Sequence, residues 1–295
     1  MLVTPLPLIH HHLPLSKGGF VSLPFCDAAG SLADSESIEK VLISEAIKKA
    51  KQKRINYITI RSTKPFAGLS DDKTLHQAKV RMLLELPSDS EKLLKSFKSK
   101  HRSQVKKPMR DGLTADIGSF ELLSDFYPLF SENMKDLGSP VHSIKWLKSV
   151  LENYGNKAHL AIVRMPDKTP AAGGIILCHP EQVSIPWASS LRRFNRWNPN
   201  MLLYWTFLKY ASDNGFPLFD FGRSTQEEGT FRFKKQWGAK PAPLYWSTFS
   251  IANDSWENDS LQGKSRLEGA DDYWRKLPLF VTEIMGPFLR KYIDL

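Results

Sequence analysis

The sequence has 295 residues, of which 41% are hydrophobic and 24% charged, and it contains two cysteines, Cys26 and Cys178. This composition excludes a disordered or disulfide-stabilised chain, and at roughly 150 residues a domain the length predicts about two domains. No apolar run reaches the ~18 residues of a membrane span, and the N-terminus lacks the pattern of a signal peptide. We therefore expect a cytoplasmic protein whose cysteines are reduced core thiols.

The formal net charge is +10, and much of it lies in one block without an acidic residue, between Lys92 and Arg110. Such a block attracts phosphate in RNA, in a nucleotide-linked substrate or at an anionic membrane surface. A solvated helix face is the simpler alternative, and both interpretations stay open. The candidates for contact with RNA or a donor phosphate in this block are Lys98, Arg102 and Lys106.

The first part of the chain predicts a short α/β unit. A strand at 21–25 precedes a helix that begins near Ser37, where apolar residues recur at helical spacing. Strands at 55–61 and 80–86 follow, both rich in aliphatic residues. The basic helical stretch comes next and ends at Asp111-Gly112.

The second part predicts a longer and more regular unit. Capping serines at Ser119 and Ser143 begin two helices with apolar residues at helical spacing. Alternating or continuous apolar runs predict the strands that surround them, and Gly215 ends a third long helix. In chain order the expected elements are a strand at 113–117, the two helices, strands at 159–165, 171–178 and 183–189, a helix at 200–214, a strand at 217–222, a helix at 230–237 and a strand at 243–249.

The two parts resemble each other at a fixed offset. Val21–Phe25 is similar to Val183–Trp187, an offset of 183 − 21 = 162, and the same offset places Arg61–Thr63 on Arg223–Thr225. A helix and a strand fall between the two matches in each copy, so we infer an internal duplication. Only 20 residues precede Val21, so we expect either a naturally reduced first copy or a missing start.

The element order of the second part is that of the GNAT fold, and the whole chain resembles the FemAB peptidyltransferases. Within them it is most similar to the FemAB-like proteins of the PEP-CTERM/exosortase-associated type, which contain a BioF2-like acetyltransferase domain. The segments that carry this resemblance are Asp136–Val141, Trp187–Ser189, Pro199-Asn200 with Leu203–Trp205, Phe219–Thr225, Gly229–Lys234, Gln236–Ala239, and Trp274–Leu279 with Gly286-Pro287.

The resemblance implies an α/β (α+β) fold of tandem GNAT-like lobes, each a mixed sheet flanked by helices, with the first lobe truncated. We expect an incomplete lobe over 1–90, a basic helical connector over 91–112, a complete lobe over 113–250 and a C-terminal extension over 251–295. In this fold two parallel strands splay apart and the acyl donor lies between them. Those strands would be 183–189 and 217–222.

Three residues near the end of the second splayed strand are the catalytic candidates. Lys234 matches the lysine of a Phe-Lys pair that contributes to transfer in Fem transferases, and fixed cations stabilise the negative charge that forms on a carbonyl oxygen during acyl transfer. Arg223 ends the strand, where ligands of open α/β sheets gather. Asp220 could orient either cation or accept the proton of the amine, with a structural ion pair as the alternative.

The substrate-binding candidates come from the same segments, with Trp187 as a wall of the cleft and Phe233 against the donor. Core packing is the alternative for most of the aromatic residues, and a helix-start role is the alternative for the histidine. The candidates are Trp187, Ser189, Asn200, Tyr204, Ser224, Arg232, Phe233, Trp237 and His142.

The expected cosubstrate is an activated acyl donor, aminoacyl-tRNA or acyl-CoA, with no permanently bound cofactor. The turn at 192–200 lacks the glycine that lets backbone N–H groups approach a pyrophosphate, so we expect weak acetyl-CoA binding. Arg192, Arg193 and Arg196 could still bind phosphate through their side chains. No metal is expected, because the adjacent residues His10–His12 cannot converge on one ion.

The sequence therefore favours an acyltransferase that acts on an amine of a cell-envelope or exopolysaccharide precursor. Two alternatives stay open: a non-catalytic GNAT-fold protein that binds RNA or nucleotide-linked sugars, and an acyl-CoA-dependent N-acetyltransferase. The segment Trp274–Tyr292 mixes basic and apolar residues and is interrupted by Pro278 and Pro287, so association with a membrane surface is a further hypothesis.

Overall fold

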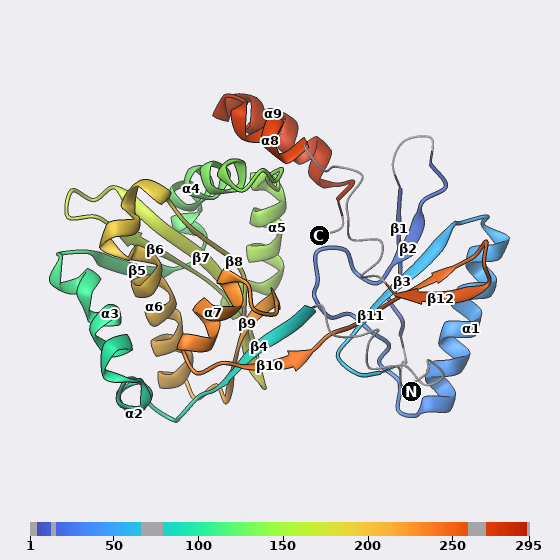
Figure 1. Ribbon diagram of the computed structural model, residues 1–295, viewed down its shortest axis with the longest axis horizontal. Helices are drawn as coiled ribbons and strands as arrows, with labels where there is room; N and C mark the ends of the chain where they lie inside the picture. The colour runs from blue at the N-terminus through green and yellow to red at the C-terminus, as the bar shows by residue number, and fades with distance from the viewer. Residues whose placement is uncertain (1–4, 13–15, 66–78, 259–269, 294–295) are drawn as a thin grey trace.

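The computed structural model describes residues 5–12, 16–65, 79–258 and 270–293. Figure 1 shows two lobes side by side, each built on its own sheet, with the C-terminal helices above their junction. The two sheets have seven and five strands, and both mix parallel and antiparallel pairs. The expected fold class, tandem lobes of mixed sheet flanked by helices, is confirmed.

The larger lobe is built on the seven-stranded sheet. Among the described residues its one parallel pair joins β8 to β9, and these strands pair at Val183↔Phe219 and Ser184↔Asp220 before they separate. The separation creates the splayed edge that the sequence predicted between these two strands. In sheet order the strands are β10 (Lys240–Pro243), β4 (Lys79–Glu85), β9 (Leu218–Thr225), β8 (Gln182–Ser190), β7 (Pro170–His179), β6 (Ala158–Arg164) and β5 (Thr114–Gly118).

Helices cover both faces of this sheet. On one face α4 (Leu123–Asp136) and α5 (Ile144–Tyr154) enclose an apolar cluster with β6 and β7. On the other face α6 (Pro199–Asp213) is apolar almost all round, as expected for a helix buried between a sheet and other helices. The remaining helical elements of this lobe are α2 (Ser90–Ser96), α3 (Ser99–Arg110), α7 (Gly229–Gln236) and the 3₁₀ turns η2 (Phe120–Leu122), η3 (Gly155–Lys157) and η4 (Arg192–Trp197).

The basic stretch is part of this core rather than a free connector. Phe97 and Val105 are buried in the same apolar cluster as α6, and α3 packs directly on α6. The basic side chains lie on the opposite, outer side of α2 and α3, where Lys98 and Lys106 are exposed. The amphipathic character of the stretch thus explains both its charge and its position.

The smaller lobe is built on the five-stranded sheet, and α1 (Glu36–Gln52) packs on it. Phe20, Ile43, Ile58 and Phe249 belong to its core. In sheet order the strands are β1 (Ile9–His11), β2 (Gly19–Val21), β3 (Tyr57–Ser62), β11 (Tyr245–Ser250) and β12 (Ser255–Asn258).

The two lobes exchange strands. β4 follows β3 in the chain but pairs with β9 of the larger sheet, and β11 follows β9 and β10 but pairs with β3 of the smaller sheet. Figure 1 shows β4 and β11 passing in opposite directions between the lobes. Neither sheet is therefore made from one continuous stretch of chain. β4 falls within the range 1–90 expected for the first lobe and β11 within the range 113–250 expected for the second, but each strand pairs in the sheet of the other lobe.

The inferred duplication corresponds to one repeated unit, a strand, a helix and a parallel strand. It is β2, α1 and β3 in the smaller lobe and β8, α6 and β9 in the larger lobe, and at the offset of 162 the range 36–52 falls on 198–214, which contains α6. The first copy differs after Val21. The expected strand at 21–25 stops there, because the chain turns at Leu23 (φ 46°) and Phe25 (φ 71°) on either side of Pro24, which cannot donate to a sheet.

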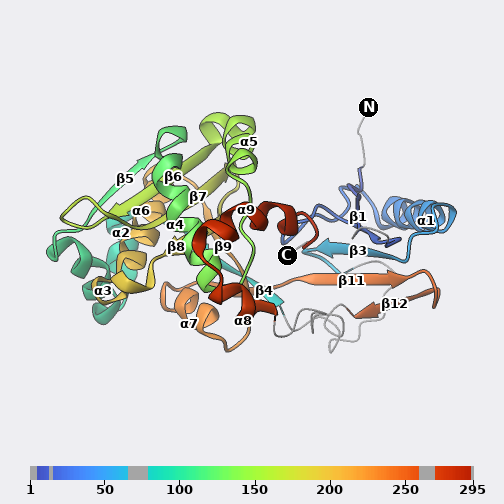
Figure 2. The ribbon, with the colours of Figure 1, turned by 90° about the horizontal axis from the view of Figure 1, so that it is seen from above.

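The C-terminal helices lie on the larger lobe. α8 (Ala270–Lys276) and α9 (Leu279–Arg290) both contact α4. Figure 2 shows them crossing α4 toward the smaller lobe, and His11 Nε2 lies 3.2 Å from the backbone oxygen of Lys291. In the parts of the chain that the structure describes, none of the helices is both long and apolar enough to span a bilayer.

Candidate functional site

A β-bulge at Gly222 shapes the end of the splayed strand β9. Arg81 of β4 pairs with Arg223 and Leu83 pairs with Asp220, so Met82 faces two residues of β9. Gly222 has φ +73°, a conformation that suits glycine. The bulge turns the carbonyl groups of Gly222 and Arg223 away from the regular ladder and toward α7.

These carbonyl groups hold Lys234. Its Nζ donates to the Gly222 oxygen at 3.1 Å and to the Arg223 oxygen at 2.7 Å. The side chain of Lys234 reaches them from α7, whose start is fixed by Arg232, since the Arg232 guanidinium donates to the Glu227 oxygen at 2.8 and 3.0 Å. A lysine ammonium has three donors, so one N–H of Lys234 remains beyond these two bonds.

Burial controls the charge of Lys234, which is only 7% exposed. Burial is the main cause that lowers its pKa, the carboxylates of Asp27 and Asp220 raise it and the positive charge of Arg223 lowers it, and the net pKa is about 8. Lys234 is therefore a cation at neutral pH that loses its proton much more readily than a surface lysine.

The smaller lobe supplies the partner of Arg223. Asp27 accepts the backbone N–H of Arg223 at 3.0 Å, and its carboxylate lies 3.7 Å from Arg223 Nε. The backbone oxygen of Asp27 accepts from Trp246 Nε1 at 2.9 Å. The Trp246 ring lies 4.8 Å from the Arg223 guanidinium and 4.5 Å from that of Arg61, the counterpart of Arg223 in the first copy. Sequence reasoning missed Asp27, because it lies 196 residues away in the chain.

Asp220 is engaged in an ion pair with β4. Its Oδ2 accepts from Arg81 Nε at 2.9 Å and from a terminal guanidinium nitrogen of Arg81 at 2.7 Å, and its Oδ1 accepts the Gly222 N–H at 2.8 Å. The same guanidinium donates to Gln182 of β8 at 3.1 Å. Asp220 thus stabilises the bulge and ties β4 to the two splayed strands, and its hydrogen-bonding partners are neither Arg223 nor Lys234.

The aromatic candidates form two groups. Tyr204 stacks on Phe221, with ring centres 5.6 Å apart, and Phe233 meets Tyr204 edge-on at 5.0 Å. Trp237 is fully buried next to this group, and its ring centre lies 4.4 Å from the ring centre of His101. Burial raises the pKa of the Tyr204 phenol. This first group packs into the core of the larger lobe, as the alternative of core packing predicts.

The second aromatic group contains Trp187 and His142, joined by Trp146. His142 stacks on Trp146 at 4.1 Å, and Trp146 meets Trp187 edge-on at 5.1 Å. Burial and the neighbouring charge of Arg290 lower the pKa of His142 to about 3, so the ring is neutral. Its Nε2 accepts from Arg290 Nε at 3.2 Å. This group connects β8 to α5 and α9.

The three smaller polar candidates lie at different depths. Ser189 is buried and its hydroxyl lies 3.0 Å from Asn133 Nδ2, which donates to it. Ser224 is buried in β9, while Asn200 is half-buried in the first turn of α6. Of the three, Asn200 is therefore the most accessible to a ligand from solvent.

The arginines of the turn at 192–197 are already engaged. Arg193 forms an ion pair with Glu132, and Arg192 donates to the Asp136 backbone oxygen at 2.9 Å. Arg196 lies over the Trp197 ring at 3.7 Å. On α3, Arg102 donates to the backbone oxygens of Phe97 and Lys95. A donor phosphate would therefore compete with Asp136 and Glu132 of α4 for Arg192 and Arg193.

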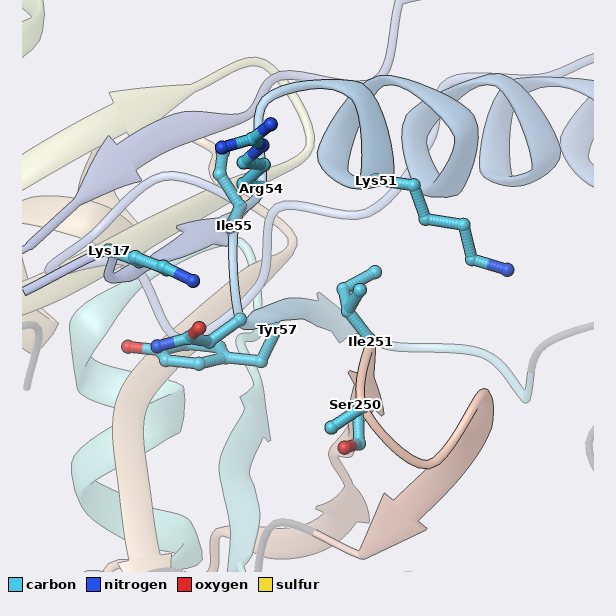
Figure 3. A pocket seen from close by; sticks show the side chains of 9 residues that line it. Lys17, Lys51, Arg54, Ile55, Tyr57, Ser250 and Ile251 are labelled. Carbon is cyan, nitrogen blue, oxygen red and sulfur yellow. The ribbon is translucent and has the colours of Figure 1, made fainter.

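The smaller lobe has a cavity of about 510 Å³ at the end of α1, and none of the candidate site residues lines it. Figure 3 shows Lys17, Lys51 and Arg54 around it, with Tyr57 and Ile251 along its sides. Lys51 is paired with Asp254 at 2.5 Å. Within the described residues no group of three or more His, Cys, Asp or Glu side chains could hold a metal ion.

The comparisons with known proteins agree with the fold. Residues 99–235 match the model of the acetyltransferase (GNAT) domain. The chain is similar to the crystal structure of FemX, with a TM-score of 0.59 and 16% identity over 86% of this chain and 85% of FemX. No curated protein matches the sequence.

Two further structures share the fold at low identity. One is L-PGS from Bacillus licheniformis, with a TM-score of 0.52 and 13% identity over 91% of this chain and 83% of that chain. The other is a C-terminal domain assigned to lysylphosphatidylglycerol synthetase from Agrobacterium fabrum, with a TM-score of 0.54 and 12% identity over 78% of this chain and 76% of that chain. Residues 99–235, which run from α3 to the end of α7 in the larger lobe, are therefore similar to a GNAT acetyltransferase domain.

Proposed function

We propose that this protein transfers an acyl or aminoacyl group from an activated donor to an amine of a cell-envelope or exopolysaccharide-related acceptor. The observation that carries the proposal is the buried Lys234 ammonium, held by two carbonyl groups of a bulge where β8 and β9 separate. A fixed cation in a site of low polarity is what stabilises the oxyanion of an acyl-transfer intermediate.

The roles follow from the chemistry of the step. The acceptor amine attacks the carbonyl carbon of the donor ester or thioester, and the carbonyl oxygen of the donor becomes negatively charged. The remaining N–H of Lys234 would donate to that oxygen, with Arg223 adding positive charge beside it. When the intermediate collapses, the bond to the donor oxygen or sulfur breaks, and this leaving group takes up a proton as the attacking amine loses one.

The composite nature of the site supports a role for both lobes. Asp27 and Trp246 from the smaller lobe hold Arg223, so the geometry at the end of β9 depends on the lobe junction. Asp27 is thus a positioning residue in this proposal. Asp220 acts through the bulge and the Arg81 ion pair, not as the group that accepts the amine proton.

Aminoacyl-tRNA is the donor that this proposal favours. Two arginines of the turn at 192–197 are held by α4, and Pro199 at the start of α6 has no N–H group, so a pyrophosphate would compete for the arginines and would find one backbone donor fewer. The exposed lysines of α2 and α3 offer a polyanion a separate basic face. One similar structure is named for lysylphosphatidylglycerol synthetase, a name that combines an amino acid with a lipid, and this supports an aminoacyl group rather than an acetyl group.

Acyl-CoA is the alternative donor, because the matched domain is an acetyltransferase domain. The envelope acceptor, the exosortase-associated context and the cytoplasmic location rest on the sequence resemblance and remain part of the proposal. Calorimetry with acetyl-CoA and filter binding of aminoacyl-tRNA at rising salt distinguish the donors. Salt-sensitive tRNA binding supports our choice, whereas tight and salt-insensitive binding of acetyl-CoA reverses it.

The transfer itself is tested with labelled donors and an envelope extract as the source of acceptors. Label should move from aminoacyl-tRNA into products that survive mild alkali, because an amide resists the hydrolysis that cleaves an aminoacyl ester. Absence of transfer from both donors, with donor binding retained, would favour the non-catalytic alternative.

A further inference from the structure

The two faces of α9 differ in an unusual way. The face toward the larger lobe carries Thr282 and Gly286, both buried. Gly286 allows close approach, because an added Cβ would lie 3.0 Å from both Cγ1 and the backbone nitrogen of Val141. α9 continues through Pro287 and begins after Pro278, so neither proline divides it. The whole opposite face of one continuous helix is therefore turned outward.

That outward face is apolar. Phe280, Ile284 and Phe288 follow one another at four-residue intervals and are 64%, 64% and 66% exposed, and Met285 and Leu289 lie beside them. With ~150–250 Å² for a full aromatic side chain, the five side chains present roughly 500 Å² of apolar surface. A helix on the surface of a soluble lobe normally turns polar residues outward, so this face points to a partner.

The charged residues that immediately flank α9 in the chain are basic. Lys276 precedes α9 and Lys291 follows it, and both are exposed. The acidic residue of α9, Glu283, lies on the side that faces Tyr127 of α4, and its negative charge contributes to raising the pKa of the Tyr127 phenol. The protein as a whole carries a formal charge of +10. An apolar row on a helix with lysines at both ends is the pattern of a helix that lies in the interface of an anionic bilayer.

We propose that the outward face of α9 docks the protein on the surface of an anionic lipid bilayer. A second copy of the chain fits the face less well, because a stable interface buries ~800 Å² on each partner, more than this face offers. The aromatic side chains at positions 280 and 288 suit the boundary between headgroups and acyl chains.

Docking would orient the candidate site. Arg290 near the end of α9 contacts His142, which reaches Trp187 on β8 through Trp146. The α9 side of the splayed strands would then face the membrane surface. If the protein transfers an acyl group as proposed above, this orientation implies that the acceptor amine belongs to a lipid or a lipid-linked precursor. The docking proposal itself does not depend on transfer.

The test is co-sedimentation of the full chain with vesicles of phosphatidylcholine, with or without about 30% phosphatidylglycerol. The variant Phe280→Ser/Ile284→Ser/Phe288→Ser removes the apolar row from exposed positions. The matched control, Leu32→Ser/Val41→Ser, removes exposed apolar side chains of the smaller lobe. We expect salt-sensitive binding to the anionic vesicles, a loss of at least about tenfold in the triple variant, and no change in the control.

Several results would overturn docking. One is that the wild-type protein stays in the supernatant when it is mixed with anionic vesicles. Another is that the triple variant binds these vesicles as well as the wild type does. Self-association of the wild type without vesicles, abolished in the triple variant, would assign the face to a second copy instead. Transfer measured with a soluble amine acceptor would be unaffected by any of these results, so docking and the proposed function can fail independently.

Discussion

Lys234→Met should change how stability depends on pH more than it changes stability near neutrality. Methionine fills a similar volume without a charge. The variant loses two hydrogen bonds to backbone carbonyl groups, and a buried carbonyl without its partner costs about 1–3 kcal/mol. The variant also avoids the free-energy cost of burying an ammonium group. The fall of the lysine pKa from 10.5 to about 8 corresponds to about 3 kcal/mol. Near pH 7 this gain offsets much of the loss of about 2–6 kcal/mol expected for the two carbonyl groups.

The pH dependence separates these effects. Below about pH 8 both the native and the unfolded wild type hold the Lys234 proton, so the cost of burial is constant. Between about pH 8 and 10.5 the unfolded chain holds this proton and the native chain has released it. Because the unfolded state then binds more protons, the stability of the wild type rises with pH relative to the variant, by up to about 3 kcal/mol.

Urea unfolding of both proteins at several pH values measures this difference. Other groups that titrate in the same range are common to the two proteins and cancel in the comparison. Lys235→Met is the control, because Lys235 is the exposed neighbour on the same helix. The reasoning is refuted if the stabilities of the wild type and Lys234→Met run parallel from pH 7 to about pH 10.

Three further substitutions test the supports of the site. Arg81→Met leaves the carboxylate of Asp220 buried without its partner, and we expect a loss of about 3–5 kcal/mol in thermal or urea unfolding; a loss below about 1 kcal/mol would contradict the ion pair. Gly222→Ala has room for its methyl group, whose nearest contact is Asp27 at 3.5 Å, but its positive φ should still destabilise by about 1 kcal/mol or more; an unchanged melting temperature would argue against the bulge. Asp27→Asn removes a negative charge that raises the pKa of Lys234, so NMR titration of the methylated amine should give a pKa below that of the wild type, and an equal or higher pKa would contradict the placement of Asp27.

The sequence predicted the larger lobe well, because its signals are local. Continuous apolar runs identified β6 to β9, and Gly215 together with the apolar residues identified α6. The repeat at an offset of 162 identified the strand, helix and strand unit of both lobes. These patterns arise from each segment burying its own side chains, so they can be recognised without the rest of the chain.

The strand exchange could not be predicted from the same patterns. The sequences of β4 and β11 each predict a strand, but neither sequence indicates with which strand it pairs or in which of the two sheets it lies. The site was recognised only in part for the same reason. Lys234 and Arg223 lie 11 residues apart in the chain, whereas Asp27 reaches Arg223 from the other lobe and Arg81 reaches Asp220 from the exchanged strand. The ion pair of Asp220 with Arg81 joins residues 139 positions apart.

The measurement that tests the central claim most directly is the rate of label transfer from aminoacyl-tRNA to amide products by wild type, Lys234→Met and Lys235→Met. If Lys234 stabilises the oxyanion, its replacement should slow transfer by about 10²–10³-fold, the usual cost of removing one such donor. Lys235→Met should transfer at the wild-type rate. Transfer by Lys234→Met at the wild-type rate, with the fold verified by its unfolding curve, would contradict the account.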